Sequence, residues 1–254
     1  MDKFVYHLNL GEKQVKGARF AFLPGDPGRV PLIASRLDDS CQLASNREFC
    51  TYLGRLEGEN VLVTSTGIGG PSTSIAIEEL AQLGVDTFIR VGSTGAIQKN
   101  IGVKEVIITS GSVRLDGASS HYASIEYPAV AHYEIVKALA EASESLGISA
   151  HVGITASSDT FYPGQERYDS FSGYVKQSLQ GSMAELQRMN VLNYEMESAA
   201  VLVLASVFKL RAGCVMGVVV NRTKQEKLDS EAIKEAENNA ISVAISAMRK
   251  IVSA

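Results

Sequence analysis

The residues best suited to chemistry lie in the run 88–97, which begins as an apolar stretch and continues as the Gly-Ser-Thr-Gly segment 92–95. The pattern predicts a buried strand that breaks into a turn. Glycines let the backbone approach a ligand closely, and successive N–H groups together with two hydroxyls can face one group of oxygens. Arg90 precedes this turn, and a guanidinium inside an apolar run is costly unless an anion meets it. The run indicates a local anion site, although an ordinary tight turn, with Arg90 paired to a structural carboxylate, fits equally well.

Arg29 is a second candidate anion ligand. Residues 19–23 predict a short strand, and the Pro-Gly-Asp-Pro-Gly segment 24–28 predicts a turn that leads into a helix. Arg29 would then lie just inside the helix, where a cation opposes the helix dipole unless an anion is also present. Arg29 is therefore either an anion ligand or a solvated surface side chain.

The loop 159–168 combines aromatic and polar side chains in a way typical of nucleobase recognition. Phe161 could stack on a flat ring, while Gln165 and Arg167 could hydrogen-bond to the edge of that ring. The alternative is an aromatic side chain that only packs against the rest of the protein.

Glu197 comes just before residues 198–208, which are apolar nearly all round and predict a buried helix. An acidic residue at a helix N-terminus is ordinarily no more than a charge that suits the helix dipole. A buried helix would draw this carboxylate inward, however, where it could hold hydroxyl groups of a sugar.

The elements that must position these residues alternate between strands and helices. Further strands are expected at 61–65, 106–110, 151–157 and 214–220, and helices at 75–83, 131–146, 198–208 and, capped by Asp229, up to residue 252. The chain shows no repeat, low-complexity tract or linker. The pattern therefore predicts one α/β domain over residues 1–254.

The composition narrows the possible partners and the compartment. A chain of 254 residues can bury a full hydrophobic core, and its three cysteines form no CxxC pair, which argues against a disulfide framework and indicates a reducing cytoplasm. A net charge of -4 argues against nucleic acid or an anionic membrane as the main partner. We expect no signal peptide and no membrane-spanning helix, since no apolar run has the necessary length.

Several other functional motifs are disfavoured. Gly67, Gly69 and Ser72, with Asp86 further on, resemble a dinucleotide-binding fingerprint, but they follow a later strand than the first expected one, which the fingerprint usually follows. No GxxxxGK[ST] loop and no GxSxG elbow occurs in the sequence. The histidines lack the spacing of metal ligands; they are His7, His121, His132 and His151.

Two stretches carry a resemblance to a known family. Residues 65–75, Ser-Thr-Gly-Ile-Gly-Gly-Pro-Ser-Thr-Ser-Ile, followed by Glu79 and Leu80, are similar to the signature of the nucleoside phosphorylase family of hexameric architecture. Residues 157–167, Ser-Ser-Asp-Thr-Phe-Tyr-Pro-Gly-Gln-Glu-Arg, look like the insertion of those members that act on uridine. The resemblance covers almost the whole chain.

The resemblance implies a fold and an activity. The expected fold is a three-layer αβα sandwich around a central mixed, twisted β-sheet. The expected reaction is a pentosyl transfer of pyrimidine salvage, the reversible phosphorolysis of uridine to uracil and ribose 1-phosphate. The family also suggests a cytoplasmic homohexamer built as a trimer of dimers, with no organic cofactor and with a monovalent cation, such as potassium, where two subunits meet.

The resemblance also assigns roles to individual residues. Its phosphate ligands would be Gly25, Arg29, Arg90, Gly92, Ser93 and Thr94, with Arg47 reaching in from a neighbouring subunit. The uracil would be held by Thr94, Gly95, Phe161, Gln165 and Arg167, and the ribose by Glu195, Met196 and Glu197, with His7 from the neighbour. Arg222 would line the pocket, and the cation ligands would be Glu48, Ile68 and Ser72.

These roles predict a mechanism without a covalent protein intermediate, because phosphate is itself the nucleophile at C1′. Catalysis would consist of placing phosphate and stabilising charge while an oxocarbenium-like sugar forms. The residues in direct catalytic roles would be Arg90, Gln165, Arg167 and Glu197. Gln165 and Arg167 would stabilise the negative charge that gathers on the departing uracil.

Two rival functions are weighed against this one. A phosphorylase or nucleosidase acting on purines would typically present an acidic residue after the last strand, where Asn221 and Arg222 stand here. A nucleoside sensor on the same fold would be expected to have lost part of the set Arg29, Arg90, Arg167 and Glu197, and all are present.

Overall fold

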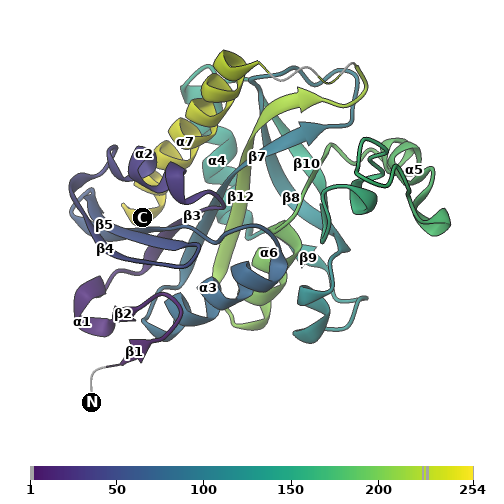
Figure 1. Cartoon of the computed structure of the whole chain (residues 1–254). Coiled ribbons are helices and arrows are strands. Elements are labelled where there is room, and N and C mark those ends of the chain that lie inside the picture. The colour runs from purple at the N-terminus through teal and green to yellow at the C-terminus, as the bar shows by residue number, and fades with distance from the viewer. Residues whose placement is uncertain (1–2, 225, 227–228, 254) are drawn as a thin grey trace.

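A mixed β-sheet runs through the computed structural model, which describes residues 3–224, 226 and 229–253 (Figure 1). In the described residues the sheet has ten strands, in the order β11-β10-β8-β12-β7-β3-β6-β5-β4, with β9 paired to β8. Its strands are β3 (Phe20–Pro24), β4 (Asp38–Asn46), β5 (Phe49–Leu56), β6 (Glu59–Thr64), β7 (Thr87–Ala96), β8 (Val106–Leu115), β9 (Ala129–Val130), β10 (Ala150–Ser158), β11 (Asn193–Glu195) and β12 (Arg211–Asn221). A separate hairpin pairs β1 (Phe4–Val5) with β2 (Leu10–Gly11).

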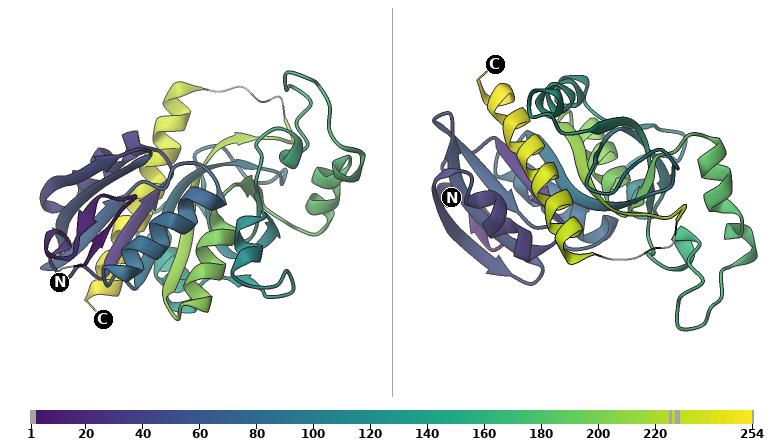
Figure 2. Two further views of the ribbon diagram at one scale, coloured as in Figure 1. Left: turned by 60° about the horizontal axis from the view of Figure 1, so that its bottom comes forward. Right: turned by 90° about the horizontal axis from the view of Figure 1, so that it is seen from above.

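Helices cover both faces of the sheet. The α-helices are α1 (Glu12–Val15), α2 (Val30–Ala34), α3 (Gly70–Gln82), α4 (Tyr133–Ser145), α5 (Ser182–Arg188), α6 (Ser198–Val207) and α7 (Ser230–Val252). Helices α3 and α6 pack together on one face, while α4 and α7 pack together on the other, beside α2 (Figures 1 and 2). The predicted three-layer arrangement around a mixed sheet is confirmed.

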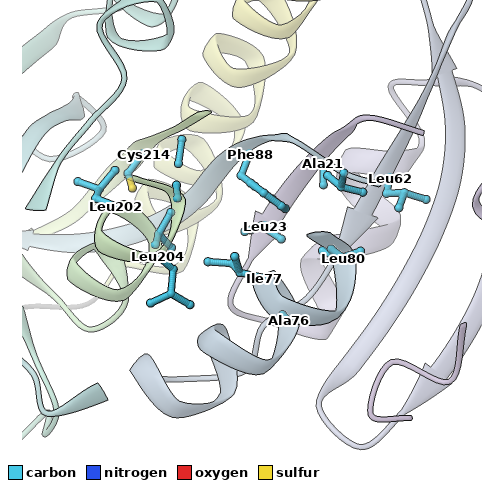
Figure 3. Packing of buried hydrophobic residues seen from close by; sticks show 14 of the residues in the cluster. Ala21, Leu23, Leu62, Ala76, Ile77, Leu80, Phe88, Leu202, Leu204 and Cys214 are labelled. Carbon is cyan, nitrogen blue, oxygen red and sulfur yellow. The ribbon is translucent and has the colours of Figure 1, made fainter. Parts of the chain in front are cut away.

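The central strands are buried on both sides, as their continuous apolar runs require. In β3, Ala21 and Leu23 belong to the core under α3 and α6, whereas Phe20 and Phe22 belong to the core under α2, α4 and α7. Figure 3 shows the first of these cores, in which Phe88 of β7 lies among side chains of α3 and α6. Because side chains alternate along a strand, Arg90 lies on the same face as Phe88.

The short strand β11 closes part of the sheet on itself. It pairs in parallel with β10 and antiparallel with the end of β7, where Tyr194 lies opposite Gly95. The strands β7, β12, β8, β10 and β11 therefore form a closed ring. The closure brings the residues that follow β11 beside the end of β7, which no local pattern in the sequence indicated.

The prediction of a turn at residues 92–95 is wrong. These residues continue strand β7, which remains paired with β12 as far as Ala96, across a register shift between Val218 and Val220. Pairing with β12 along the segment, and with β11 at Gly95 and Ala96, keeps these residues extended, so their glycines do not form a turn. A Cβ on Gly92 would lie 3.0 Å from Met216 Cγ and 3.2 Å from Arg90 Nη2, so glycine makes room for the arginine.

Other elements also differ from expectation. Strands β4 and β5 form a hairpin that was not expected from the sequence. Most side chains of β4 are exposed, so this strand has no apolar pattern that would reveal it. Helix α5 was not expected either; with the loop before it, it extends outward from the sheet (Figure 2). Arg29 ends a 3₁₀ turn, Pro27–Arg29, and lies before α2 rather than inside it.

The last helix agrees with its pattern. Asp229 caps α7, and its side chain accepts hydrogen bonds from the N–H groups of Glu231 and Ala232. Within the part of the chain that the structure describes, no helix is long and apolar enough to cross a membrane. The assignment of one domain to residues 1–254 stays a prediction.

Close packing of α7 on β12 depends on Gly217. A Cβ at this position would lie 2.2 Å from the carbonyl oxygen of Ala236 in α7, which is backbone and cannot rotate away. We expect Gly217→Ala to lower the free energy of unfolding by about 1–3 kcal/mol, the usual cost of overpacking, in urea denaturation.

Gly11→Ala is the matched control. A Cβ there meets nothing closer than Gln14 Oε1 at 3.4 Å, so a loss below about 1 kcal/mol is expected. Equal stability of the two variants would contradict the close contact between α7 and β12.

Candidate active site

A cavity of about 850 Å³ opens at the carboxyl ends of the parallel strands β3, β6, β7 and β12, where ligands bind in open α/β sheets. It gathers predicted site residues from distant parts of the chain. Those in its wall are Gly25, Arg29, Glu48, Ile68, Arg90, Ser93, Thr94, Gly95, Phe161, Gln165, Arg167, Glu195, Met196 and Glu197.

Arg90 is the buried cation of this site, with 4% of its surface exposed. Its Nε donates to Glu195 Oε2 at 3.0 Å, and its Nη2 donates to Glu197. Burial alone would lower the pKa of Arg90, but the carboxylates of Glu197 and Glu195 more than offset this and hold the pKa above its ordinary value. Arg90 therefore pairs with structural carboxylates, as one of the two interpretations of the sequence held.

One donor of Arg90 is nevertheless left over. Its Nη1 is buried without a partner among the described residues. This nitrogen lies toward Gly25, since a Cβ on Gly25 would be 3.8 Å from it. A buried unpaired N–H costs about 1–3 kcal/mol, so an anion that reaches it would be bound favourably. Pairing with carboxylates and binding of an anion are thus compatible.

Glu195 and Glu197 tie this arginine to the start of α6. Glu195 accepts hydrogen bonds from the backbone of Glu197 and Ser198 and from Ser198 Oγ at 2.6 Å. Glu197 accepts from the backbone N–H of Gly69 at 2.6 Å, which joins α6 to the turn before α3. Burial raises the pKa of Glu197, and the charge of Arg90 only partly opposes the increase.

Arg29 is held in a similar way. Asp26 accepts from the N–H of Gly28 at 2.8 Å and shapes the 3₁₀ turn that carries Arg29. The guanidinium donates to Glu237 Oε1 at 2.7 Å and to the carbonyl of Val91 at 3.3 Å. Its Nε is buried without a partner in the described structure.

Three of the predicted uracil ligands, Phe161, Gln165 and Arg167, lie together in the cavity wall, and Arg222 lies beside Arg167. The guanidinium of Arg167 lies 4.3 Å from the centre of the Phe161 ring, and Gln165 is buried beside the cavity. Arg167 Nη1 and Arg222 Nε both donate to Glu226, at 2.8 and 3.0 Å. Burial, and then the charge of Arg167, hold the pKa of Arg222 below its ordinary value.

The arginines of the site share one arrangement. Each is paired with a carboxylate, and each keeps one buried N–H for which the described residues offer no partner. The unpartnered atoms are Arg29 Nε, Arg90 Nη1, Arg167 Nε and Arg222 Nη1. These four arginines are thus matched by the four glutamates that pair with them, while each guanidinium keeps one nitrogen that could donate to a ligand.

Two of the predicted ligands, Thr94 and Gly95, also make contacts inside the protein. The hydroxyl of Thr94 donates to the carbonyl of Tyr194 at 2.6 Å and accepts from Asn193 Nδ2 at 2.8 Å. Gly95 makes room for Arg222, whose Cδ would lie 3.2 Å from a Cβ at that position. These residues therefore support neighbouring parts of the site in addition to facing the cavity.

Some predicted residues lie outside the cavity wall. Gly92 lies in β7 beside Arg90, and Arg222 packs behind Gly95. Arg47 is exposed in the turn between β4 and β5, and His7 is hydrogen-bonded through Nδ1 to Glu79 at 2.6 Å. Their roles toward a neighbouring subunit stay predictions.

The proposed cation ligands lie close together. A Cβ on Gly67 would lie 2.8 Å from Glu48 Cγ and 3.3 Å from Ser72 Oγ, and this hydroxyl donates to the carbonyl of Ile68 at 3.2 Å. A carboxylate, a hydroxyl and a carbonyl are oxygen ligands of the kind that hard cations prefer. The donor set therefore fits a hard cation.

Sequence reasoning missed Glu226 and Glu237, the carboxylates that hold the arginines other than Arg90. Glu226 follows Arg222 at the i,i+4 spacing of an ion pair, which is a weak signal. Glu237 lies 208 positions from Arg29, and nothing in the local sequence connects them. Asn193 and Tyr194 were also missed, since their contacts depend on the closure of β11 onto β7.

The mixed α/β fold and the arginine-lined cavity define a class of protein whose site has donors suited to an anion, and comparison with known families agrees with this class. The chain belongs to the phosphorylase superfamily, whose family model matches residues 19–253.

Individual relatives have more specific names. The chain is 55% identical over 248 residues to the uridine phosphorylase of Escherichia coli (strain K12), and the matched region covers 98% of each chain. It is 54% identical over 249 residues to the uridine phosphorylase of Haemophilus influenzae, over 98% of this chain and 99% of the relative. It is 36% identical over 237 residues to the guanosine phosphorylase of Halorubrum lacusprofundi, over 92% of each chain.

The buried pair of Arg90 and Glu195 yields a stability prediction. Glu195→Gln removes a charge that faces a buried guanidinium and caps α6, and breaking such a pair typically costs about 3–5 kcal/mol. We expect a loss of this size in the free energy of unfolding, measured by urea denaturation at neutral pH.

Glu57→Gln tests the same change at the surface. Glu57 pairs with Arg249, and both side chains are more than two-fifths exposed. Such exposed pairs contribute at most about 1 kcal/mol. A Glu195 variant as stable as the Glu57 variant would show that the Arg90 pair does not support the fold.

Proposed function

We propose that the protein catalyses the reversible phosphorolysis of uridine to uracil and ribose 1-phosphate. The observation that carries this proposal is one cavity in which Arg29 and Arg90 retain buried donors while Phe161, Gln165 and Arg167 form a separate group suited to a pyrimidine. The uridine phosphorylases named above match nearly the whole chain, which supports the same reaction.

Phosphate is bound by Arg29 and Arg90 and acts as the nucleophile at C1′ of the ribose. Arg90 is fixed before substrate arrives, because Glu195 and Glu197 already hold it. Such preorganisation places the phosphate without further rearrangement. The anion also stabilises the positive charge that develops on the sugar as the bond to the base breaks.

Glu197 holds the ribose hydroxyls. One of its oxygens accepts from Gly69 and the other from Arg90, so the carboxylate is fixed between the phosphate ligand and the turn before α3. Each carboxylate oxygen has a second lone pair that can accept a hydrogen bond from a sugar hydroxyl. Glu197 therefore orients the sugar and transfers no proton.

Gln165 and Arg167 bind the edge of the uracil and stabilise the negative charge that it gains on leaving. Donors that are stronger partners for the departing anion than for the bound nucleoside lower the barrier. The ring of Phe161 provides an apolar surface for the base, with Arg167 stacked on it at 4.3 Å.

The position after the last strand favours a pyrimidine. The side-chain amide of Asn221 donates to the carbonyls of Gln98 and Ile101 and accepts from Thr223. It is therefore fully used inside the protein and is not part of the cavity wall. Position 221 thus offers no acid to protonate a purine ring nitrogen, and Glu226, the acid after β12 that lines the cavity, is paired with Arg167 and Arg222. One relative is nevertheless a guanosine phosphorylase.

The assembly and its surroundings belong to the proposal as well. A homohexamer, as a trimer of dimers, would bring Arg47 and His7 of one subunit to the cavity of another. A monovalent cation at the subunit contact would be held by Glu48, Ile68 and Ser72, and would offset the negative charge of the Glu48 carboxylate. A cytoplasmic location agrees with Cys41, Cys50 and Cys214 being free thiols.

The reaction is tested by incubating the protein with uridine or inosine, each with and without phosphate, and identifying the products by chromatography. We expect uracil and ribose 1-phosphate from uridine only when phosphate is present, and no comparable release of hypoxanthine. Release without phosphate would identify a hydrolase, and no release from either nucleoside would support a sensor.

Kinetics of single variants test the division of roles. Arg167→Ala should lower kcat by about 10²–10³-fold, as removal of a donor to developing charge does, with little change in the KM for phosphate. Arg29→Ala should chiefly raise the KM for phosphate, on the order of tenfold or more, since it removes charged hydrogen bonds. Equal effects of both variants on both constants would contradict separate phosphate and base roles.

A further inference from the structure

Two carboxylates that follow β12 in the chain form ion pairs with arginines of the site, and neither has been given a role above. We propose that Glu237 is the positioning residue of Arg29, on the phosphate side, and that Glu226 is the positioning residue of Arg167 and Arg222, on the base side. The proposal rests on the proposed function, since it concerns how the residues of that reaction are held.

Glu237 acts through Arg29 and not on the ligand. It lies in α7 outside the cavity wall, whereas Arg29 is in that wall. Their oxygen and nitrogen are 2.7 Å apart, with only 8% of the arginine side chain and 23% of the glutamate side chain exposed. An ion pair at this burial is screened little by water, so it fixes one conformation of the long arginine side chain.

The backbone under Glu237 is fixed as well. The preceding residue, Ala236, is fully buried, and its carbonyl packs onto Gly217 of β12. The second contact of Arg29 is the carbonyl of Val91 in β7. Arg29 is therefore held between the sheet and the last helix, and Nε stays available for an anion.

Glu226 reduces the electrostatic repulsion between two buried cations. Arg167 and Arg222 have side chains only 8% and 5% exposed, and each donates to a different oxygen of Glu226. Burial alone would raise the pKa of Glu226, but hydrogen bonds and charges from Arg167 and then Arg222 lower it, so the group stays ionised near neutral pH. One carboxylate thus orients both guanidiniums.

The two ion pairs share no residue. Glu237 contacts Arg29 and Glu226 contacts the other two arginines, so loss of one carboxylate leaves the other pair intact. Phosphate binding and base binding should therefore respond separately to the two substitutions. A merely structural role would instead change stability and all kinetic constants together.

The test compares Glu237→Gln, Glu226→Gln and Glu235→Gln in the full-length protein. Glu235 lies on α7 in an exposed pair with Lys104, which makes it a matched control. We measure kcat, the KM for phosphate and the KM for uridine, the dissociation constants of inorganic phosphate and of uracil by calorimetry, and the unfolding temperature.

For Glu237→Gln we expect the KM and the dissociation constant of phosphate to rise on the order of tenfold, with the uridine KM within about twofold. For Glu226→Gln we expect kcat to fall and the dissociation constant of uracil to rise on the order of tenfold, with phosphate binding within about twofold. The control variant should match the unchanged protein in every constant.

A double-substitution experiment tests the coupling directly. In an Arg29→Ala background, Glu237→Gln should add nothing further to the phosphate constants, whereas Glu226→Gln should still lower kcat. An equal effect of Glu237→Gln with and without Arg29, or parallel changes in phosphate and uracil binding in both variants, would overturn the proposal.

The outcomes also separate this proposal from the proposed function. Calorimetry with inorganic phosphate needs no turnover. If the unchanged protein binds phosphate but releases no uracil, the proposed reaction fails, and the phosphate affinity of the Glu237 variant still decides whether Glu237 positions Arg29. If catalysis is present but Glu237→Gln leaves phosphate affinity unchanged, only the positioning role fails.

Discussion

The constraint on which the rest of the site depends is the burial of the guanidinium of Arg90. A cation inside the sheet requires carboxylates at close range, and Glu195 and Glu197 supply them. Both acids reach Arg90 only because β11 closes onto the end of β7 and leads directly into α6. Three features thus allow one charge to be buried: the closure of the sheet, the start of a buried helix and the glycine at position 92.

Balanced pairing explains how several arginines can share one cavity. Without the carboxylates, like charges around an enclosed space would repel and would pay a desolvation cost, as the lowered pKa of Arg222 shows. With them, each guanidinium is held in place and still has one buried donor to offer. An arriving anion would therefore meet donors that are already oriented by their carboxylate partners.

The sequence predicts a contact of this site only where the two residues lie close together along the chain. The pattern around Arg90, the loop of Phe161, Gln165 and Arg167, and the buried helix after Glu197 are local, and the structure brings these residues to one cavity. The partners of the arginines are not local, because sheet closure and helix packing create them. The same reason explains the error at residues 92–95: their composition is that of a turn, but strands on both sides keep them extended.

The last strand shows how fold and chemistry are linked. Toward α7, Gly217 allows the helix to approach so closely that Glu237 reaches Arg29. Further along, Val219 and Val220 form part of the cavity wall, and Arg222 then joins Glu226 behind the base-binding group. The strand β12 therefore influences the position of Arg29 through Gly217 and Glu237, and the position of Arg222 through its own carboxyl end. Because the two effects act through different residues, a substitution near Arg222 need not disturb Arg29, and one fold can keep one part of a site while another part changes.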